Sequence, residues 1–494
     1  MQNAAMGKGR QGVDGRLQPA LPESYPLKTL DELEELSYLD SFHFPFNKSS
    51  VPLKRTATRT SQRPRLLVCH DMQGGYQDDR WVQGSPNSDT YSIWHWHLID
   101  IFVYFSHSLV TLPPPCWVNT AHRHGAQVLG TFITEWDAGE ALCRRLLASK
   151  ESVFLYASRL AKLAEVLGFD GWLINIENKV EKDHINNLLE FVRLLTKLMH
   201  DTVPGSTVIW YDSVTKYGTL SWQNCLNELN KCFFDLCDGI FTNYTWKEGH
   251  PKKSAAIAGD TRRYDVYMGI DVFGRNTFGG GGFKSNVGLI AARDAGVSAA
   301  LFAPGWVYET KQSPSFVSAQ NRWWGLLAEC WPIAQQYPLD LPFFSNFNQG
   351  FWKQYFVNGS EISKTPWSNI SCQNLQPLLR IESGPLRGAL KGEISGECPA
   401  YSGGACIKFS GSIDAESQCL IALYQANVEI DTAFDVSYTV RSNNCSSLSL
   451  LIRVSKGDSV NHFILDTKED EESGKSWEIG RNLCFVPLEQ TEAF

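Results

Sequence analysis

Eight apolar, β-rich runs recur along the middle of the chain at intervals of 26 to 44 residues. They begin at residues 65, 101, 127, 171, 206, 239, 265 and 298. Each interval has room for a strand, a helix and two loops, which is the repeating unit of a parallel sheet. The runs are almost continuously apolar, so each strand should be buried on both faces. Eight such units predict a closed (β/α)8 barrel. A doubly wound open sheet is the alternative, and it is disfavoured because no strand leads into a G-x-G-x-x-G turn.

Four intervening segments have the period of amphipathic helices. Residues 151–169 place a set of apolar side chains on one side and then reach Gly168, a suitable C-cap. That set is Phe154, Leu155, Leu160, Leu163 and Leu167. The other predicted helices are 185–199, 285–296 and 316–331.

The two ends of the chain have a different texture from the middle. Residues 1–60 are rich in Gly, Pro and Ser and predict an irregular lead-in with one short amphipathic piece, 30–39. Residues 61–340 hold the predicted barrel. Residues 341–494 show short runs of period two separated by Gly, Asn and Ser turns, which is typical of a β-sandwich. The run NLCFVPLEQTEAF closes the sequence where a further strand is expected, so we expect this β-sandwich to be incomplete.

Composition excludes several classes of protein. The net charge of −8 argues against a nucleic-acid binder. The most apolar stretch, 93–110, includes an Asp and three His and does not resemble a membrane span. The first 25 residues contain no apolar signal region, and the 13 Cys form no C-x-x-C motif, so a reducing cytosolic location is expected. The 16 Trp fit either buried cores or stacking on sugar rings.

No cofactor or metal is expected from the sequence. The Gly-rich stretch 279–285 resembles a phosphate-binding loop, but Phe283 stands where a glycine must precede the lysine. His122 and His124 form a close pair without a visible third ligand, which argues against a metal site.

The carboxyl ends of the predicted strands, where a barrel places its active site, are rich in aromatic and carboxylate side chains. This mixture binds neutral sugars through stacking and hydroxyl hydrogen bonds, whereas phosphate sites use Lys and Arg. A single aromatic residue is more often core than ligand contact, but a shared location at strand ends favours binding. The candidates are Asp71, Glu135, Trp136, Tyr211, Trp246, Trp306 and Tyr308.

The fourth run, FDGWLINIEN, carries the strongest chemical signal. Asn175 and Glu177 are two residues apart, so both side chains point to the same face of the strand, about 6–7 Å apart along it. Ile174 and Ile176 should then face the helices. A satisfied polar pair lining the barrel mouth is one interpretation. A general acid/base with an orienting amide is the other, and the context favours it.

This run resembles two glycosidase families that act on N-acetylglucosamine. The chitinase-like family 18 carries FDGxxxDxE here, and Asn175 replaces its second Asp. That replacement resembles glycoside hydrolase family 85, the cytosolic endo-β-N-acetylglucosaminidases. Further matching segments, in barrel order, are HDMQGGY (70–76), ITEW (133–136), IWYDS (209–213), FTNYTW (241–246), DVFGR (271–275) and APGWVYE (303–309). The resemblance covers residues 24–380 and suggests a vertebrate form, shorter at its C-terminus than the longer animal members.

The resemblance implies a substrate-assisted retaining mechanism. Asn175 is neutral and cannot be the carboxylate nucleophile of the two-carboxylate scheme, so the 2-acetamido oxygen of the sugar would attack and form an oxazoline. Glu177 would be the acid and then the base, and Asn175 would orient the acetamide. Tyr211 either steadies the acetamide or is a core aromatic. Trp136, Trp246, Trp306 and Tyr308 would form walls and platforms, while Asp71 and Glu135 would bind hydroxyls.

The implied substrate is the GlcNAc-β1,4-GlcNAc bond in the core of N-glycans, glycoproteins and free oligosaccharides, with transfer to acceptors other than water as a further capability. A chitinase-like hydrolase is the nearest alternative, and Asn175 speaks against it. A non-catalytic glycan-binding protein is the alternative from another class, and the intact Glu177 disfavours it.

Overall fold

The computed structural model describes residues 22–40, 46–54, 63–333, 337–383, 390–412, 418–430, 433–441, 448–456, 459–466 and 478–484. Most of the predicted lead-in and the last ten residues therefore lie outside the described residues. The short amphipathic piece predicted near residue 30 forms α1 (Leu30–Glu35) and α2 (Ser37–Asp40). A capping box of Thr29 and Glu32 begins α1, and Leu30 and Leu33 are buried.

Eight parallel strands close into a barrel, as the sequence predicts. They are β1 (Leu66–His70), β2 (Ile101–Tyr104), β4 (Gln127–Glu135), β5 (Gly171–Glu177), β6 (Thr207–Tyr211), β7 (Gly239–Thr242), β8 (Val266–Asp271) and β9 (Ser298–Phe302). Each strand pairs with the next in this order, and β9 pairs with β1 to close the ring. A short extra strand, β3 (Val110–Thr111), runs antiparallel to β4.

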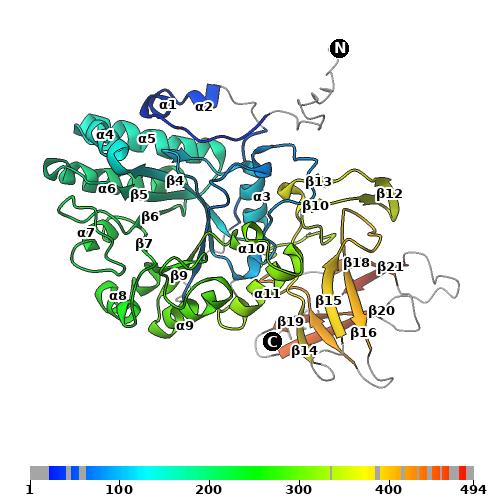
Figure 1. Cartoon of the computed structure of the whole chain (residues 1–494). Coiled ribbons are helices and arrows are strands. Elements are labelled where there is room, and N and C mark those ends of the chain that lie inside the picture. Colours follow the sequence, from blue (N-terminus) through cyan, green and yellow to red (C-terminus); the bar gives the residue numbers. More distant parts are fainter. Residues whose placement is uncertain are drawn as a thin grey trace, which may run out of the picture.

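Helices surround this barrel (Figure 1). The α-helices are α3 (Pro115–Arg123), α4 (Trp136–Leu146), α5 (Lys150–Leu167), α6 (Ile185–Thr202), α7 (Lys231–Phe234), α8 (His250–Ala258), α9 (Ser285–Ala295), α10 (Trp306–Glu309) and α11 (Phe316–Ala328). The 3₁₀ turns are η1 (Asp78–Arg80), η2 (Trp96–Leu98), η3 (Lys182–His184), η4 (Arg263–Asp265), η5 (Gly282–Lys284) and η6 (Ile370–Cys372). The eighth predicted strand, 298–309, is shorter than expected because the chain turns at Ala303 and continues as α10.

The predicted helix 151–169 is confirmed as α5, but its buried face needs a correction. Gly168 caps it in the left-handed conformation at φ 80°. Phe154 is 56% exposed instead of buried. The buried face is set by Val153 and Tyr156, which flank Phe154 and Leu155, together with Leu160, Leu163 and Leu167. An apolar residue at the edge of the helical stripe was assigned to the wrong side.

Side chains alternate between the inside of the barrel and the helical layer. On β5, Leu173 packs in the small interior cluster with Leu129 and Ile209. Ile174 and Ile176 pack in the outer core between strands and helices, as the period of two predicts. Residues 175 and 177 share the parity of Leu173, so both point into the carboxyl-end mouth of the barrel.

The chain after the barrel forms short antiparallel strand pairs, drawn beside it in Figure 1. The strands are β10 (Phe351–Trp352), β11 (Tyr355–Val357), β12 (Ser360–Ser363), β13 (Trp367–Ser368), β14 (Arg380–Ser383), β15 (Leu390–Ser395), β16 (Cys406–Gly411), β17 (Leu420–Ala422), β18 (Phe434–Val440), β19 (Ser449–Lys456), β20 (Ser459–Asp466) and β21 (Glu478–Cys484). Their pairs are β10–β13, β11–β12, β14–β17, β15–β16, β18–β21 and β19–β20.

The segment just after the barrel is bonded to it. Gln373 is fully buried, accepts a hydrogen bond from Trp96 Nε1 at 2.7 Å and donates one to Ile93 O at 3.0 Å. Thr120 Oγ1 donates to Ile370 O at 2.6 Å. The division into three domains, with boundaries near 60 and 340, remains a prediction. Within the described ranges, no helix is long and apolar enough to cross a bilayer.

Candidate active site

The side chains of Asn175 and Glu177 are bonded to each other at the carboxyl end of β5. Asn175 Nδ2 donates to Glu177 Oε2 at 3.1 Å. Trp222 Nε1, from the long loop between β6 and α7, donates to Glu177 Oε1 at 3.0 Å. Both carboxyl oxygens are therefore held, which fixes the orientation of the group. Burial raises the pKa of Glu177, and the two donors only partly oppose this effect.

The second polar atom of the Asn175 side chain is an unused acceptor. The residue is 3% exposed, and Oδ1 is buried with no hydrogen-bond donor among the described residues. A buried carbonyl oxygen without a partner costs about 1–3 kcal/mol, so such an atom calls for an explanation. A ligand N–H group would satisfy it.

A second carboxylate lies beside Glu177 on the neighbouring strand. Glu135 and Glu177 are register partners in the parallel β4–β5 pair. His107 Nδ1 lies 3.1 Å from both Glu135 oxygens, and this bond raises the pKa of His107. The Glu135 charge adds to the raised pKa of Glu177, whereas His107 lowers that pKa. Glu135 is thus held by His107 beside Glu177.

Tyr211 and Asn243 form the adjoining wall of the mouth. The Tyr211 hydroxyl donates to Asn243 Oδ1 at 3.1 Å. Burial first, and then the nearby Glu177 charge, raise the pKa of Tyr211 well above its usual value. The two side chains come from the ends of neighbouring strands, β6 and β7.

Asp71, after β1, and the ion pair of Asp271 and Arg275, at the end of β8, line the side of the mouth across from Glu177. Arg275 Nε and Nη2 donate to the two oxygens of Asp271 at 2.8 and 2.9 Å. Burial raises the pKa of Asp71, and the charges of His107 and Arg275 oppose this rise. Burial also raises the pKa of Tyr244, which senses the charges of Asp271 and Glu177.

The predicted aromatic residues separate into three situations. Trp136 is 61% exposed at the rim, directly after Glu135. Trp306 and Tyr308 are half-buried on α10, where Trp306 lies edge-on to Phe283 at 5.3 Å and the Tyr308 hydroxyl donates to the Asp89 carbonyl at 3.0 Å.

The fourth aromatic, Trp246, does not lie in the position expected of a substrate wall. It is 2% exposed, stacks on Phe278 at 4.4 Å and donates from Nε1 to Gly269 O at 2.6 Å. Its ring packs in the outer core between strands and helices. The burial does not favour a substrate contact, which stays a prediction for Trp246.

Three residues of the site were missed by sequence reasoning. Trp222, His107 and Asn243 all contact the predicted residues. Asn243 was recoverable, since it directly follows β7 in the same position that Asp212 occupies after β6. Trp222 and His107 come from loops, and no period fixes where a loop side chain points.

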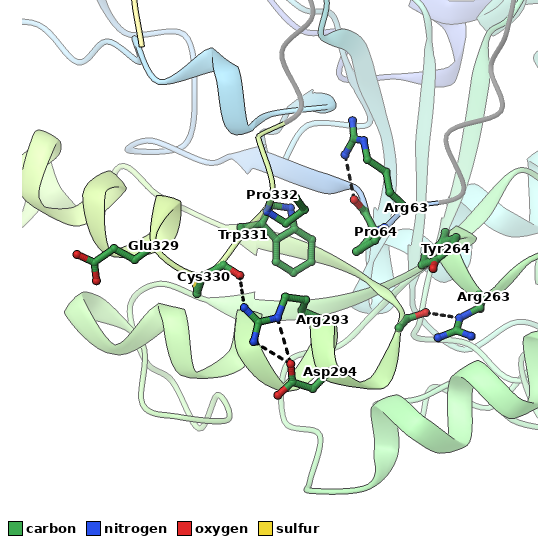
Figure 2. A pocket seen from close by; sticks show the side chains of 11 residues that line it. Arg63, Pro64, Arg263, Tyr264, Arg293, Asp294, Glu329, Cys330, Trp331 and Pro332 are labelled. Atoms are coloured by element: carbon green, nitrogen blue, oxygen red, sulfur yellow. Dashed lines mark hydrogen bonds and ion pairs between the residues drawn. The ribbon is translucent and has the colours of Figure 1, made fainter. Parts of the chain in front are cut away.

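A depression of about 630 Å³ lies at the other end of the barrel, where the strands begin. Figure 2 shows Arg63, Arg263 and Arg293 around it, bonded to backbone carbonyls and to Asp294. Asp170, which directly precedes β5, is also remote from the mouth, and its carboxylate lies 2.7 Å from His122 Nε2. Among the residues that the structure describes, no group of three or more His, Cys, Asp or Glu is placed to hold a metal ion.

The barrel, with the buried acid Glu177 and its orienting amide Asn175 at the mouth, defines a glycosidase-like site. The profile of glycosyl hydrolase family 85 matches residues 76–355, and the chain belongs to this family. The chain is similar to cytosolic endo-beta-N-acetylglucosaminidases 1 and 2 of Arabidopsis thaliana, with 56% and 51% identity over 88% and 92% of this chain. It is 41% identical to the Homo sapiens cytosolic endo-beta-N-acetylglucosaminidase over 88% of this chain.

The chain spans 64%, 68% and 59% of the lengths of these three relatives. The expectation of a vertebrate form is not confirmed, because the plant relatives share more identity with the chain than the human one does. The glycoside hydrolase domain of Endo-D from Streptococcus pneumoniae R6 matches with a TM-score of 0.72 at 19% identity, over 94% of this chain and 80% of that chain. This likeness supports the fold.

Proposed function

We propose that the protein is an endo-β-N-acetylglucosaminidase that hydrolyses the GlcNAc-β1,4-GlcNAc bond in the core of N-glycans and free oligosaccharides. Family membership and the names of the relatives support this activity. The observation that carries it is the buried Asn175 Oδ1 without a donor, two residues from an acid. A 2-acetamido sugar brings both the N–H that this oxygen lacks and the nucleophile that the site lacks.

The first step uses Glu177 in its protonated form. The acetamide oxygen attacks the anomeric carbon, the glycosidic bond breaks, and the Glu177 proton passes to the leaving oxygen. Asn175 Oδ1 accepts the acetamide N–H and holds the attacking oxygen under the carbon, so the reaction becomes intramolecular. The product of this step is an oxazolinium ion, which keeps the N–H proton in its hydrogen bond to Asn175 Oδ1 and lies beside the Glu177 carboxylate.

The second step uses Glu177 as a base. The carboxylate removes a proton from water, which attacks the anomeric carbon from the side that the leaving group vacated. Two inversions give retention. A sugar hydroxyl in place of water gives transfer of the glycan. The raised pKa of Glu177 supports both steps. It keeps the acid protonated closer to neutral pH for the first step, and it makes the carboxylate a stronger base for the second.

The surrounding residues have supporting roles in this proposal. Tyr211 steadies the acetamide or the intermediate, and Asp71 and Glu135 bind sugar hydroxyls at the mouth. Trp136 at the rim, and Trp306 and Tyr308 on α10, offer aromatic faces for the flanking sugars.

The names of the relatives support a cytosolic location. Domains at 61–340 and 341–494 are part of the same proposal.

Mass spectrometry of the products from a glycopeptide with an intact chitobiose core tests the function. The proposal predicts a released glycan that is one GlcNAc short and a peptide that keeps one GlcNAc. Cleavage of chitin oligomers with the glycopeptide left intact would favour a chitinase-like hydrolase instead. Binding without cleavage would favour a glycan-binding protein.

A further inference from the structure

The loop that delivers Trp222 to Glu177 is long and carries no regular element until α7. It leaves β6 after Tyr211 and runs through residues 212–230. Its first part folds into a hairpin, in which Val214 bridges Leu220 and Ser213 Oγ donates to Ile176 O at 2.5 Å. The second part, which includes Trp222, is organised differently.

The second part of the loop is organised by one buried carboxylate. Asp212 is 1% exposed and directly follows β6. Its Oδ1 accepts from Gln223 N and Asn230 Nδ2, each at 3.1 Å. Its Oδ2 accepts from Asn224 N at 2.6 Å and, more weakly, from Asn243 N at 3.5 Å. These bonds hold the two residues that follow Trp222.

The same carboxylate also reaches the adjoining wall of the catalytic mouth, which Tyr211 and Asn243 form. Asn224 has a left-handed φ of 58°, and its Oδ1 accepts from Asn243 Nδ2 at 2.8 Å and from Thr245 N at 3.1 Å. With its amide nitrogen so engaged, Asn243 presents its oxygen to the Tyr211 hydroxyl. Asp212 and Asn224 therefore form one network that ends at Trp222 in one direction and at Tyr211 in the other.

We infer that Asp212 is a positioning residue for the glycosidase reaction, which holds Trp222 against Glu177 and Asn243 against Tyr211 through its bonds to Gln223, Asn224, Asn230 and Asn243. This inference rests on the proposed function. Asp212 itself lies behind the mouth, and no role in touching the substrate is assigned to it.

The chemistry of the group suits this role. A carboxylate offers acceptor sites on both oxygens and can take four donors, whereas an amide of the same shape would turn an N–H₂ toward backbone N–H groups. Burial raises the pKa of Asp212 to about 6, and its donors oppose the rise. The titratable groups that face it are Tyr211 from β6 and Cys225 from the loop.

The effect of Asp212 on Glu177 can be measured in the pH profile of kcat/KM. Trp222 Nε1 lowers the pKa of Glu177 by donating to it. The other titratable groups that face Glu177 are Glu135 from β4, His107 from the loop after β2, Tyr211 from β6 and Tyr244 from the loop after β7. Loss of the Trp222 bond should raise the pKa of Glu177 and move the alkaline limb of the kcat/KM profile to higher pH.

The test compares D212N, W222F and the double variant across the pH profile of kcat/KM. We expect both W222F and D212N to move the alkaline limb to higher pH. W222F should lower kcat/KM by about 10-fold and D212N by about 100-fold, which is the range for lost supporting bonds. The double variant should resemble D212N, because both act through the same bond. The matched control is D170N, another buried Asp that accepts a backbone N–H, from Val128 at 2.8 Å, but at the far end of β5. D170N should lower Tm and leave the alkaline limb in place.

A second readout does not depend on activity. In protein labelled with ¹⁵N-tryptophan, the Trp222 indole N–H signal is the one that W222F lacks. It should titrate with Glu177 in the wild type and lose that titration in D212N. If D212N does not fold, N224A breaks the same network with a smaller change and should give the same result.

The two proposals fail in different ways. A wild-type protein that leaves the glycopeptide intact overturns the proposed function, and the indole titration still tests the positioning role. An active wild type whose alkaline limb and indole titration are unchanged in D212N or N224A overturns the positioning role alone. The positioning role is also overturned if the alkaline limb of kcat/KM moves no further in D212N than it does in D170N.

Discussion

Asn175 Nδ2 donates a hydrogen bond of 3.1 Å to Glu177 Oε2, while the other polar atom of the same amide, Oδ1, is buried without a donor among the described residues. One side chain thus orients the acid and leaves an acceptor for an N–H of the substrate. This division of the amide separates the site from one with two carboxylates, in which the second group would be a charged nucleophile.

Removal of the acid should abolish turnover. We expect E177Q to lower kcat/KM by about 10³-fold or more, within the usual contribution of general acid–base catalysis. Hydrolysis of a labelled glycopeptide measures this, and circular dichroism checks that the variant is folded. Full activity in folded E177Q would refute the assignment.

The same variant should be more stable than the wild type at neutral pH. The pKa of Glu177 is raised in the folded protein, so the folded state binds the proton more tightly than the unfolded state does. The ionised carboxyl therefore costs stability once the pH exceeds its unfolded pKa of about 4.5. Thermal unfolding should give E177Q a higher Tm than wild type at pH 7 and no such gain at pH 4. An equal difference at both pH values would argue against the raised pKa.

Glu135 should matter less than Glu177. It is bonded to His107, and the proposed mechanism gives it the role of binding sugar hydroxyls and not that of the nucleophile. E135Q should lower kcat/KM by about 10-fold, as expected for a supporting bond. H107Q removes a positive charge that lowers the pKa of Glu177 and should move the alkaline limb of the rate profile to higher pH. Loss of activity in E135Q as complete as in E177Q would instead favour a two-carboxylate mechanism.

The two kinds of tryptophan should respond differently to substitution. W246F loses a buried bond to Gly269 O and should lower the free energy of unfolding by about 1 kcal/mol with little change in KM. W136A removes an exposed ring and should leave stability within about 0.5 kcal/mol of wild type. Its KM for the glycopeptide should rise. Urea unfolding and steady-state kinetics on both variants measure these effects. A raised KM in W246F with unchanged stability would restore Trp246 as a substrate contact.

The barrel and the acid could be predicted because both follow from strand period. Eight buried runs fix the number of strands, and a period of two puts Asn175 and Glu177 on one face. Trp222 and His107 could not be predicted, because each lies on a loop whose course depends on distant bonds, such as those to Asp212. The burial of Trp246 could not be predicted for a related reason. Its position just after β7 is readable, but the direction in which the chain turns there is not.

The most direct test of the mechanism supplies the intermediate ready-made. A synthetic glycan oxazoline bypasses the step in which Asn175 orients the acetamide, but it still needs Glu177 as a base. We predict that N175A loses about 100-fold or more in kcat/KM on the glycopeptide and keeps rates near wild type, within about tenfold, with the oxazoline, a contrast set by positioning. E177Q should fail with both. Equal losses of N175A on the two substrates would contradict substrate assistance at this site.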